Sequence, residues 1–156
     1  MIELELVGVR VELPHNQPIV LLKERTGDRF LPIWIGAVEA TSIAFALQGV
    51  VTARPMTHDL MRNMLEDLAV SLDRVVVTAL RDGTFYAELQ MTQDGESFVT
   101  SSRPSDAIAL AVRATVPIFA NEEVLAEAGI EIEDEEEVEV ERFKEFLDGV
   151  SPEDFR

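Results

Sequence analysis

The chain contains no cysteine, no long apolar run and relatively few basic residues. Without cysteine, disulfides and thiolate chemistry are excluded. No apolar stretch approaches the roughly 20 residues that a membrane-spanning helix needs. The first residues include Glu3 and Glu5, where a secretory signal would carry basic side chains. These absences favour a cytoplasmic protein and argue against membrane partners.

Basic side chains are scarce enough to bear on function. The chain has 13 Lys and Arg against 30 Asp and Glu, a formal net charge of −17. Such a field repels phosphate backbones and lowers encounter rates with nucleic acid. Any activity on nucleic acid must therefore rely on a local basic site or a bound cation. The simpler interpretation is that the acidic balance only keeps the protein soluble.

The 156 residues are enough for one ordinary domain, and 47% are hydrophobic, so a core can form. We expect a compact domain over residues 1–130 and an acidic linker with a short amphipathic helix over 131–156. The last helix, with Phe143, Phe146 and Leu147, could dock on the body of the protein or bind a protein partner.

Alternating and helical periodicities predict an α+β fold. Antiparallel hairpins dominate the expected connections, which favours a largely antiparallel or mixed sheet meander with helices packed on it. The expected strands cover residues 2–13, 19–24, 29–35, 75–80, 85–91, 96–100 and 116–119. The expected helices cover residues 37–47, 57–69, part of 103–115, and a last segment capped by Asn121. Trp34, within an apolar strand, is expected in the core.

The first candidate segment is Arg54-Pro55-Met56-Thr57-His58-Asp59, at a junction between a loop and a helix. Free N–H groups at a helix start suit a phosphate, which Arg54 could clamp. His58 could act as acid or base near neutral pH, and Asp59 could hold a cation or orient the imidazole. The structural alternative is that Thr57 caps the helix and Asp59 favours its dipole.

The second candidate segment, Ser101-Ser102-Arg103-Pro104-Ser105-Asp106, repeats this pattern before an alanine-rich helix. Ser102 or Arg103 should be the cap, with Pro104 in the first turn. Two such helix starts in one small domain raise the chance that they converge on one anion.

Glu39, near the start of an expected helix, could pair with Arg54 or Arg103 or bind a cation. A charge beside many apolar residues needs a partner, so pairing is the simpler interpretation. His15 lies in an expected turn and has no assigned role. The sequence lacks the patterns of a dedicated zinc site, a serine hydrolase elbow, a P-loop or a dinucleotide-binding turn.

Together these motifs resemble the bifunctional nuclease domain family over about residues 1–130. The resemblance is carried, in order, by Leu31-Pro32-Ile33-Trp34-Ile35-Gly36 with Glu39-Ala40, then Arg54 to Leu60, Gly83-Thr84-Phe85-Tyr86-Ala87, Arg103 to Ala111, and Pro117-Ile118-Phe119. The tail resembles that of actinobacterial members.

The resemblance implies an α+β fold, a homodimer and nuclease activity on both DNA and RNA. It implies catalytic roles for Glu39, His58, Asp59 and Asp106, and substrate binding by Arg54, Thr57, Arg103 and Ser105. Mg²⁺ or Mn²⁺ could be held by Glu39, Asp59 and Asp106. Many members have Asp where this chain has Ser101, so a cation that uses that Asp in relatives would need the other carboxylates here.

Two functions follow from these residues. The first is a phosphodiesterase in which the arginines bind the scissile phosphate. The second is a non-enzymatic module that senses an anion or binds a protein, with the same Arg, Asp and Glu side chains forming a structural network. Arginines sealed by internal acids favour the second function, and a cleft with open arginines favours the first.

Overall fold

The computed structural model describes residues 1–12 and 16–131. Glu131, expected to begin the linker, belongs to the last described strand, and the rest of the expected linker, the last helix and His15 lie outside the described residues. The strands are β1 (Ile2–Glu12), β2 (Gln17–Glu24), β3 (Arg29–Trp34), β4 (Ser71–Arg81), β5 (Thr84–Gln93), β6 (Glu96–Ser102), β7 (Ile118–Ala120) and β8 (Ile130–Glu131). The helices are α1 (Ala37–Gln48), α2 (Thr57–Asp67), α3 (Pro104–Ala114) and α4 (Glu122–Ala128). The expected α+β fold is confirmed.

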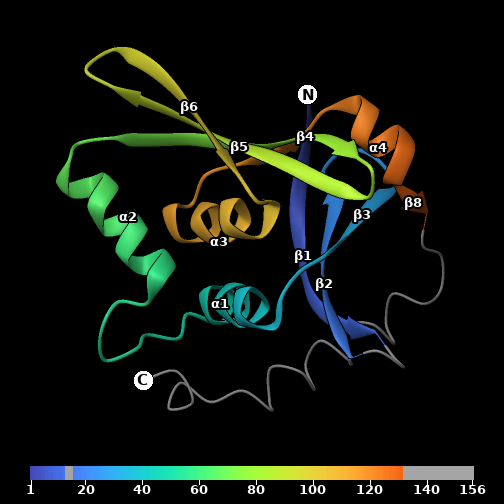
Figure 1. Cartoon of the computed structure of the whole chain (residues 1–156), viewed down its shortest axis with the longest axis horizontal. Helices are drawn as coiled ribbons and strands as arrows, with labels where there is room; N and C mark the ends of the chain where they lie inside the picture. Colours follow the sequence, from blue (N-terminus) through green and yellow to red (C-terminus); the bar gives the residue numbers. More distant parts are fainter. Residues whose placement is uncertain (13–15, 132–156) are drawn as a thin grey trace.

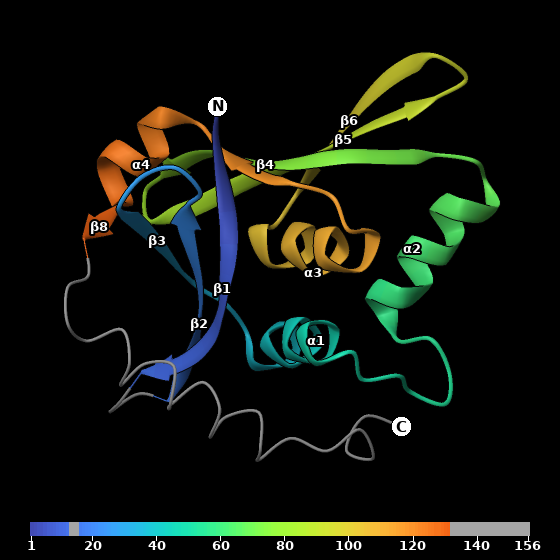
Figure 2. The same ribbon diagram turned by 180° about the vertical axis from the view of Figure 1, so that it is seen from behind.

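The strands form one mixed eight-stranded sheet in the order β6-β5-β4-β7-β1-β2-β3-β8. β4 and β7 pair in parallel, and the other neighbouring strands pair antiparallel. Figures 1 and 2 show that β1 to β3 and β4 to β5 run along two sides of the molecule, with α1 and α3 in the angle between them. The sheet therefore wraps the two helices that carry most of the candidate site.

The core lies between the sheet and the helices α1 and α3, which pack against each other and against the strands. Both helices are rich in alanine, and their buried residues include Ala40, Ala44, Ala107 and Ala111. Small side chains let the helices approach closely, which brings polar groups on facing turns within hydrogen-bond distance. α1 ends at Gly49, as expected, in the left-handed conformation with φ 67°.

The prediction that Trp34 lies in the core is wrong, because its side chain is 49% exposed. Ile33 and Ile35 on either side are buried. Successive side chains of a strand point to opposite faces of the sheet, so burial of these two neighbours turns Trp34 outward.

α2 also departs from the simple expectation of one buried apolar stripe. Met61 and Leu65 pack on the core, whereas Leu60, Met64 and Leu68 are exposed. Figures 1 and 2 show α2 at the edge of the molecule, where it can bury only one side. No helix among the described residues is long and apolar enough to cross a membrane.

Candidate functional site

The beginnings of α2 and α3 carry the two segments singled out by sequence. α3 starts as expected, with Arg103 at the N-cap and Pro104 as the first helical residue. α2 starts differently, because Met56 occupies the N-cap and Asp59 Oδ2 accepts its N–H at 3.1 Å. The prediction that Thr57 caps this helix is therefore wrong. Asp59, one turn into the helix, reaches back to the free N–H group instead.

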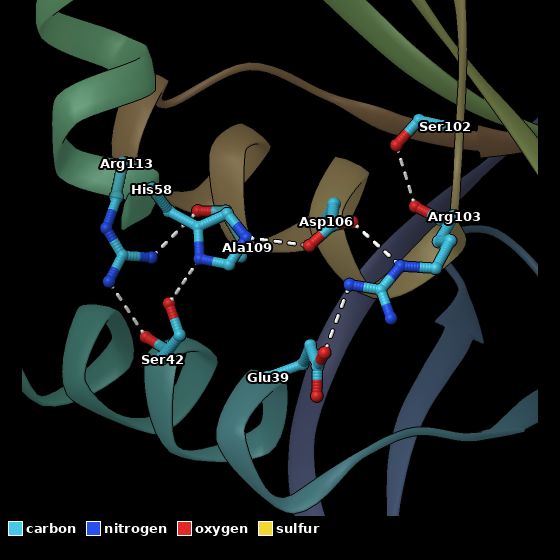
Figure 3. A network of polar contacts seen from close by, with 8 residues as sticks. All are labelled: Glu39, Ser42, His58, Ser102, Arg103, Asp106, Ala109 and Arg113. Atoms are coloured by element: carbon cyan, nitrogen blue, oxygen red, sulfur yellow. Dashed lines mark hydrogen bonds and ion pairs between the residues drawn. The ribbon is translucent and has the colours of Figure 1, made fainter. Parts of the chain in front are cut away.

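His58 joins these two helix starts to α1. Its side chain is 6% exposed, with Nδ1 2.7 Å from Ser42 Oγ and Nε2 2.9 Å from Asp106 Oδ1. Figure 3 shows the imidazole between the serine of α1 and the aspartate of α3. Both ring nitrogens are thus occupied, and one buried side chain connects three helices.

Arg103 borders the same cluster on its solvent side. Its Nε donates to Asp106 Oδ2 at 2.9 Å, and a terminal nitrogen donates to Glu39 Oε1 at 3.0 Å. The expected pairing of Glu39 with Arg103 is confirmed, and Figure 3 shows the guanidinium between the two carboxylates. The Arg103 side chain is nevertheless 64% exposed. An outside anion can therefore reach this guanidinium.

The ion pairs stabilise the charged forms of these groups. Burial alone would raise the pKa of Asp106, but hydrogen bonds from His58 and Arg103 outweigh it and leave the pKa below the ordinary value. The carboxylates of Asp106 and Glu39 raise the pKa of Arg103 further. Asp106 is thus an anion under neutral conditions, held in place by one cation and one imidazole.

Arg113, near the end of α3, is a central residue that the sequence analysis missed. Its Nε donates to Asp59 Oδ1 at 2.7 Å, and its two terminal nitrogens donate to the carbonyl oxygens of Ala109 and Ser42, each at 3.0 Å. The side chain is only 6% exposed. Burial would raise the pKa of Asp59, but the bonds from Arg113 and from the Met56 N–H bring that pKa below its ordinary value. Arg113 therefore ties α3 to both α1 and α2.

Sequence signals for Ser42 and Arg113 did exist. Each is a polar residue inside a segment dominated by alanine and other apolar side chains. A buried polar group needs a hydrogen-bond partner, so such isolated positions mark polar contacts between helices. What the sequence lacks is the identity of the partner.

Arg54 does not belong to the cluster that Glu39, His58, Arg103 and Asp106 form. It lines a cavity of about 390 Å³ together with Asp59, Arg62 and Arg113, and Arg103 does not line this cavity. The two helix starts meet through His58 and Asp106, but their arginines belong to separate sites. Thr57 is exposed at the start of α2, and Ser105 is buried.

The carboxylates expected to hold a cation are bound to nitrogen groups: Glu39 to Arg103, Asp106 to Arg103 and His58, and Asp59 to Arg113. Within residues 1–12 and 16–131, no group of three or more His, Cys, Asp or Glu side chains could hold a metal ion. As arranged, these residues do not fit Mg²⁺ or Mn²⁺, so metal binding stays a prediction.

Comparison with known proteins assigns the chain to a family. The family model for the bifunctional nuclease domain matches residues 20–133. An uncharacterized protein of Mycobacterium tuberculosis strain H37Rv is 50% identical over 99% of this chain and 98% of its own length.

The relatives that are named bifunctional nucleases are less similar in sequence to this chain. Bifunctional nuclease 2 of Arabidopsis thaliana is 29% identical over 78% of the chain. Bifunctional nuclease 1 of Oryza sativa subsp. japonica is 28% identical over 80% of the chain. These matches span only 37% and 38% of the two plant proteins. From the family model and the mycobacterial relative, the chain belongs to the bifunctional nuclease domain family.

Proposed function

We propose that this chain hydrolyses phosphodiester bonds in DNA and RNA, with Arg103 binding the scissile phosphate. The observation that carries the proposal is the exposed guanidinium of Arg103, which contacts Asp106 beside the buried His58. Nε and one terminal nitrogen of Arg103 have protein partners, and the other terminal nitrogen has none among the described residues. A planar guanidinium can bind a phosphate through two parallel hydrogen bonds.

Binding of a phosphate at Arg103 changes the partner of Glu39. The pair between these residues is partly exposed and must loosen when phosphate oxygens take the same N–H groups. The freed Glu39 carboxylate then accepts a proton from the attacking water as the water oxygen bonds to phosphorus, a role that typically contributes about 10²–10⁴-fold. The bond from phosphorus to the leaving sugar oxygen breaks, and solvent water protonates that oxygen at this exposed site. Asp106 keeps its bond to His58 and holds Arg103 in place. His58, with both ring nitrogens occupied, has a positioning role in this arrangement.

A non-enzymatic function has its own supporting observation. Each site carboxylate already has an internal cationic or imidazole partner, and His58 is almost fully buried. In this alternative the network fixes the ends of α2 and α3, and Arg103 binds an anion or a protein without chemistry.

Cleavage of labelled single- and double-stranded DNA and RNA by highly purified full-length protein separates the two functions. We expect Arg103→Gln to lower kcat by about 100-fold or more, because it removes a charge that contacts the reacting phosphate. Arg25→Gln is the control, since Arg25 is a similarly exposed arginine paired with Glu3. Equal activity of wild type and Arg103→Gln means that a contaminant cleaves. No cleavage by wild type under any condition supports the non-enzymatic function.

The same assay tests the expected cofactor. Reactions with Mg²⁺, with Mn²⁺ and with a chelator are compared for wild type and Glu39→Gln. A cation bound by Glu39 would lose affinity in this variant, which equilibrium dialysis measures without reference to activity. None of the proposed cleavage steps involves a metal.

We also propose that the chain forms a homodimer in the cytoplasm. The exposed Leu60, Met64 and Leu68 on α2 are consistent with a buried face in a dimer. Sedimentation equilibrium measures the mass in solution, and a monomer at micromolar concentration contradicts the proposal. A protein partner for the helix expected near the C-terminus stays a prediction that falls outside the described residues.

A further inference from the structure

A basic cavity lies at the ends of α1 and α3, apart from the cluster of Glu39, His58, Arg103 and Asp106. Its walls come from Ala46 and Gly49 at the end of α1, Val112 and Arg113 at the end of α3, one side of α2, and the loop between α1 and α2. Its volume is about 390 Å³. Figures 1 and 2 show α2 and this loop on the side of the molecule away from β1 to β3. None of Glu39, His58, Arg103 or Asp106 lines it.

The charge of this cavity is opposite to that of the whole chain. Three arginines, Arg54, Arg62 and Arg113, and one acid, Asp59, line it, which leaves a net charge of two positive units. The chain as a whole carries −17. Like charges gathered in one hollow repel one another unless an anion compensates them. The cavity is therefore a local anion-binding environment on an acidic protein.

The three arginines have different roles. Arg113 uses Nε and both terminal nitrogens on Asp59, Ala109 and Ser42, so it fixes the wall. Arg54 is exposed, and its guanidinium has no hydrogen bond or ion pair among the described residues. Arg62 donates from one terminal nitrogen to Asn63 Oδ1 at 3.2 Å and forms an ion pair with Glu66 at 4.0 Å, and its Nε is buried without a hydrogen-bond partner. Arg54 thus has its whole guanidinium available for a ligand, and Arg62 has the other terminal nitrogen.

The remaining lining selects the kind of anion. Val50, Val51, Ala53 and Val112 provide apolar surface, while Thr52 and Asn63 add polar groups. Pockets of about 300–1,000 Å³ with apolar walls and a few polar groups are typical of small-molecule sites. A phosphomonoester dianion balances the net charge of the cavity, and a sugar or base can cover the apolar wall.

We infer that this cavity binds a phosphomonoester of mononucleotide size, with Arg54 and Arg62 holding the phosphate. This assignment does not depend on nuclease activity, because the residues proposed for cleavage lie outside the cavity. Asp59 connects this cavity with the proposed cleavage site along the sequence. It lines the cavity, where it binds Arg113, and it directly follows His58.

Isothermal titration calorimetry of the full chain with AMP, adenosine and inorganic phosphate tests the inference. We expect AMP to bind at least about tenfold more tightly than adenosine, because the charge-assisted bonds to phosphate are lost without it. Arg54→Gln and Arg62→Gln should each weaken AMP binding about tenfold. Arg25→Gln, at an exposed arginine that does not line this cavity, should bind AMP as wild type does. A 5′-phosphorylated dinucleotide is titrated in parallel, to learn whether free nucleotides or strand ends supply the phosphate.

Several results would overturn the inference: no AMP binding at millimolar concentration, equal binding of adenosine and AMP, or unchanged AMP affinity in both arginine variants. Phosphate that binds as tightly as AMP would overturn the assignment to a nucleotide. Circular dichroism of each variant identifies any loss caused by unfolding. AMP contains no phosphodiester bond and calorimetry measures its binding without cleavage, so failure here and failure of the proposed cleavage are distinguishable.

Discussion

Buried His58 shows how much a single residue can connect. It contacts Ser42 of α1 and Asp106 of α3 while belonging to the first turn of α2. A candidate acid or base was expected at this position from the sequence. Its burial and its serine partner were not, because both depend on how closely α1 approaches α2.

Removal of this imidazole should destabilise the protein. His58→Ala leaves the Ser42 hydroxyl without a hydrogen-bond partner and the Asp106 carboxylate with Arg103 alone, which typically costs about 2–3 kcal/mol in total. Thr57→Ala is the neighbouring control at an exposed site and should change stability by less than about 0.5 kcal/mol. Urea unfolding measures both. Equal stability of the two variants would mean that the hydrogen bonds of His58 add nothing to folding.

The Asp59–Arg113 pair should make stability depend on pH. Burial raises the pKa of Asp59, but the bonds from Arg113 and the Met56 N–H, together with the nearby positive charges, outweigh it, so the folded pKa is below the ordinary value. Its contribution is complete above the unfolded pKa of about 4 and disappears as pH falls through the folded value. The difference in unfolding free energy between wild type and Asp59→Asn should therefore be largest near pH 7 and shrink towards pH 3.

Asp67→Asn is the matched control for this measurement, since Asp67 is an exposed acid at the end of the same helix. The free-energy difference for this control should change little across the same range. A difference for Asp59→Asn that stays constant with pH would show that the ion pair is not formed in solution.

Element boundaries depend on both local signals and pairing. Glycine after α1 and proline at the start of α3 were sufficient to place those ends. β4 begins at Ser71, four residues earlier than its apolar run suggests. The pairing with β5 continues past a bulge between Leu72 and Arg74, so that Leu72 still pairs with Met91. At α4, Asn121 occupies the N-cap position, but its amide donates to the Thr78 carbonyl and no side-chain cap forms. The expected helix and its N-cap residue are confirmed, but the side-chain hydrogen bond expected of that cap is absent.

The end of α1 offers a test of local backbone preference. A Cβ added at Gly49 meets nothing within 4 Å, so only its φ of 67° opposes substitution. Gly49→Ala should lower the unfolding free energy by about 1 kcal/mol, and Gly49→Asn by less, because asparagine tolerates the left-handed region. Thermal unfolding measures both variants. An alanine variant as stable as wild type would show that α1 can end in another conformation.

The net charge acts on the whole molecule and should give any nuclease activity an unusual salt dependence. Long-range repulsion between a chain of −17 and an oligonucleotide weakens as the screening length falls. Raising ionic strength from about 10 to 150 mM shortens that length from about 30 to 8 Å. We expect kcat/KM to rise about threefold over this range. A steep fall, typical of proteins with broad basic surfaces, would mean that the negative field does not reach the substrate.

By itself, the sequence determined the fold class, the order of the helices and of every described strand except β8, and the two helix starts that carry the polar residues. These depend on periodicity, turn residues and capping, which act between neighbours in the chain. Only the tertiary structure decided which polar groups meet. It turned Trp34 outward, placed Arg113 and Ser42 in the network, and separated Arg54 from Arg103. The physical reason is that the hydrogen-bond partner of each polar side chain depends on how α1, α2 and α3 pack. These helices are far apart in the sequence, so no local sequence pattern indicates how they pack.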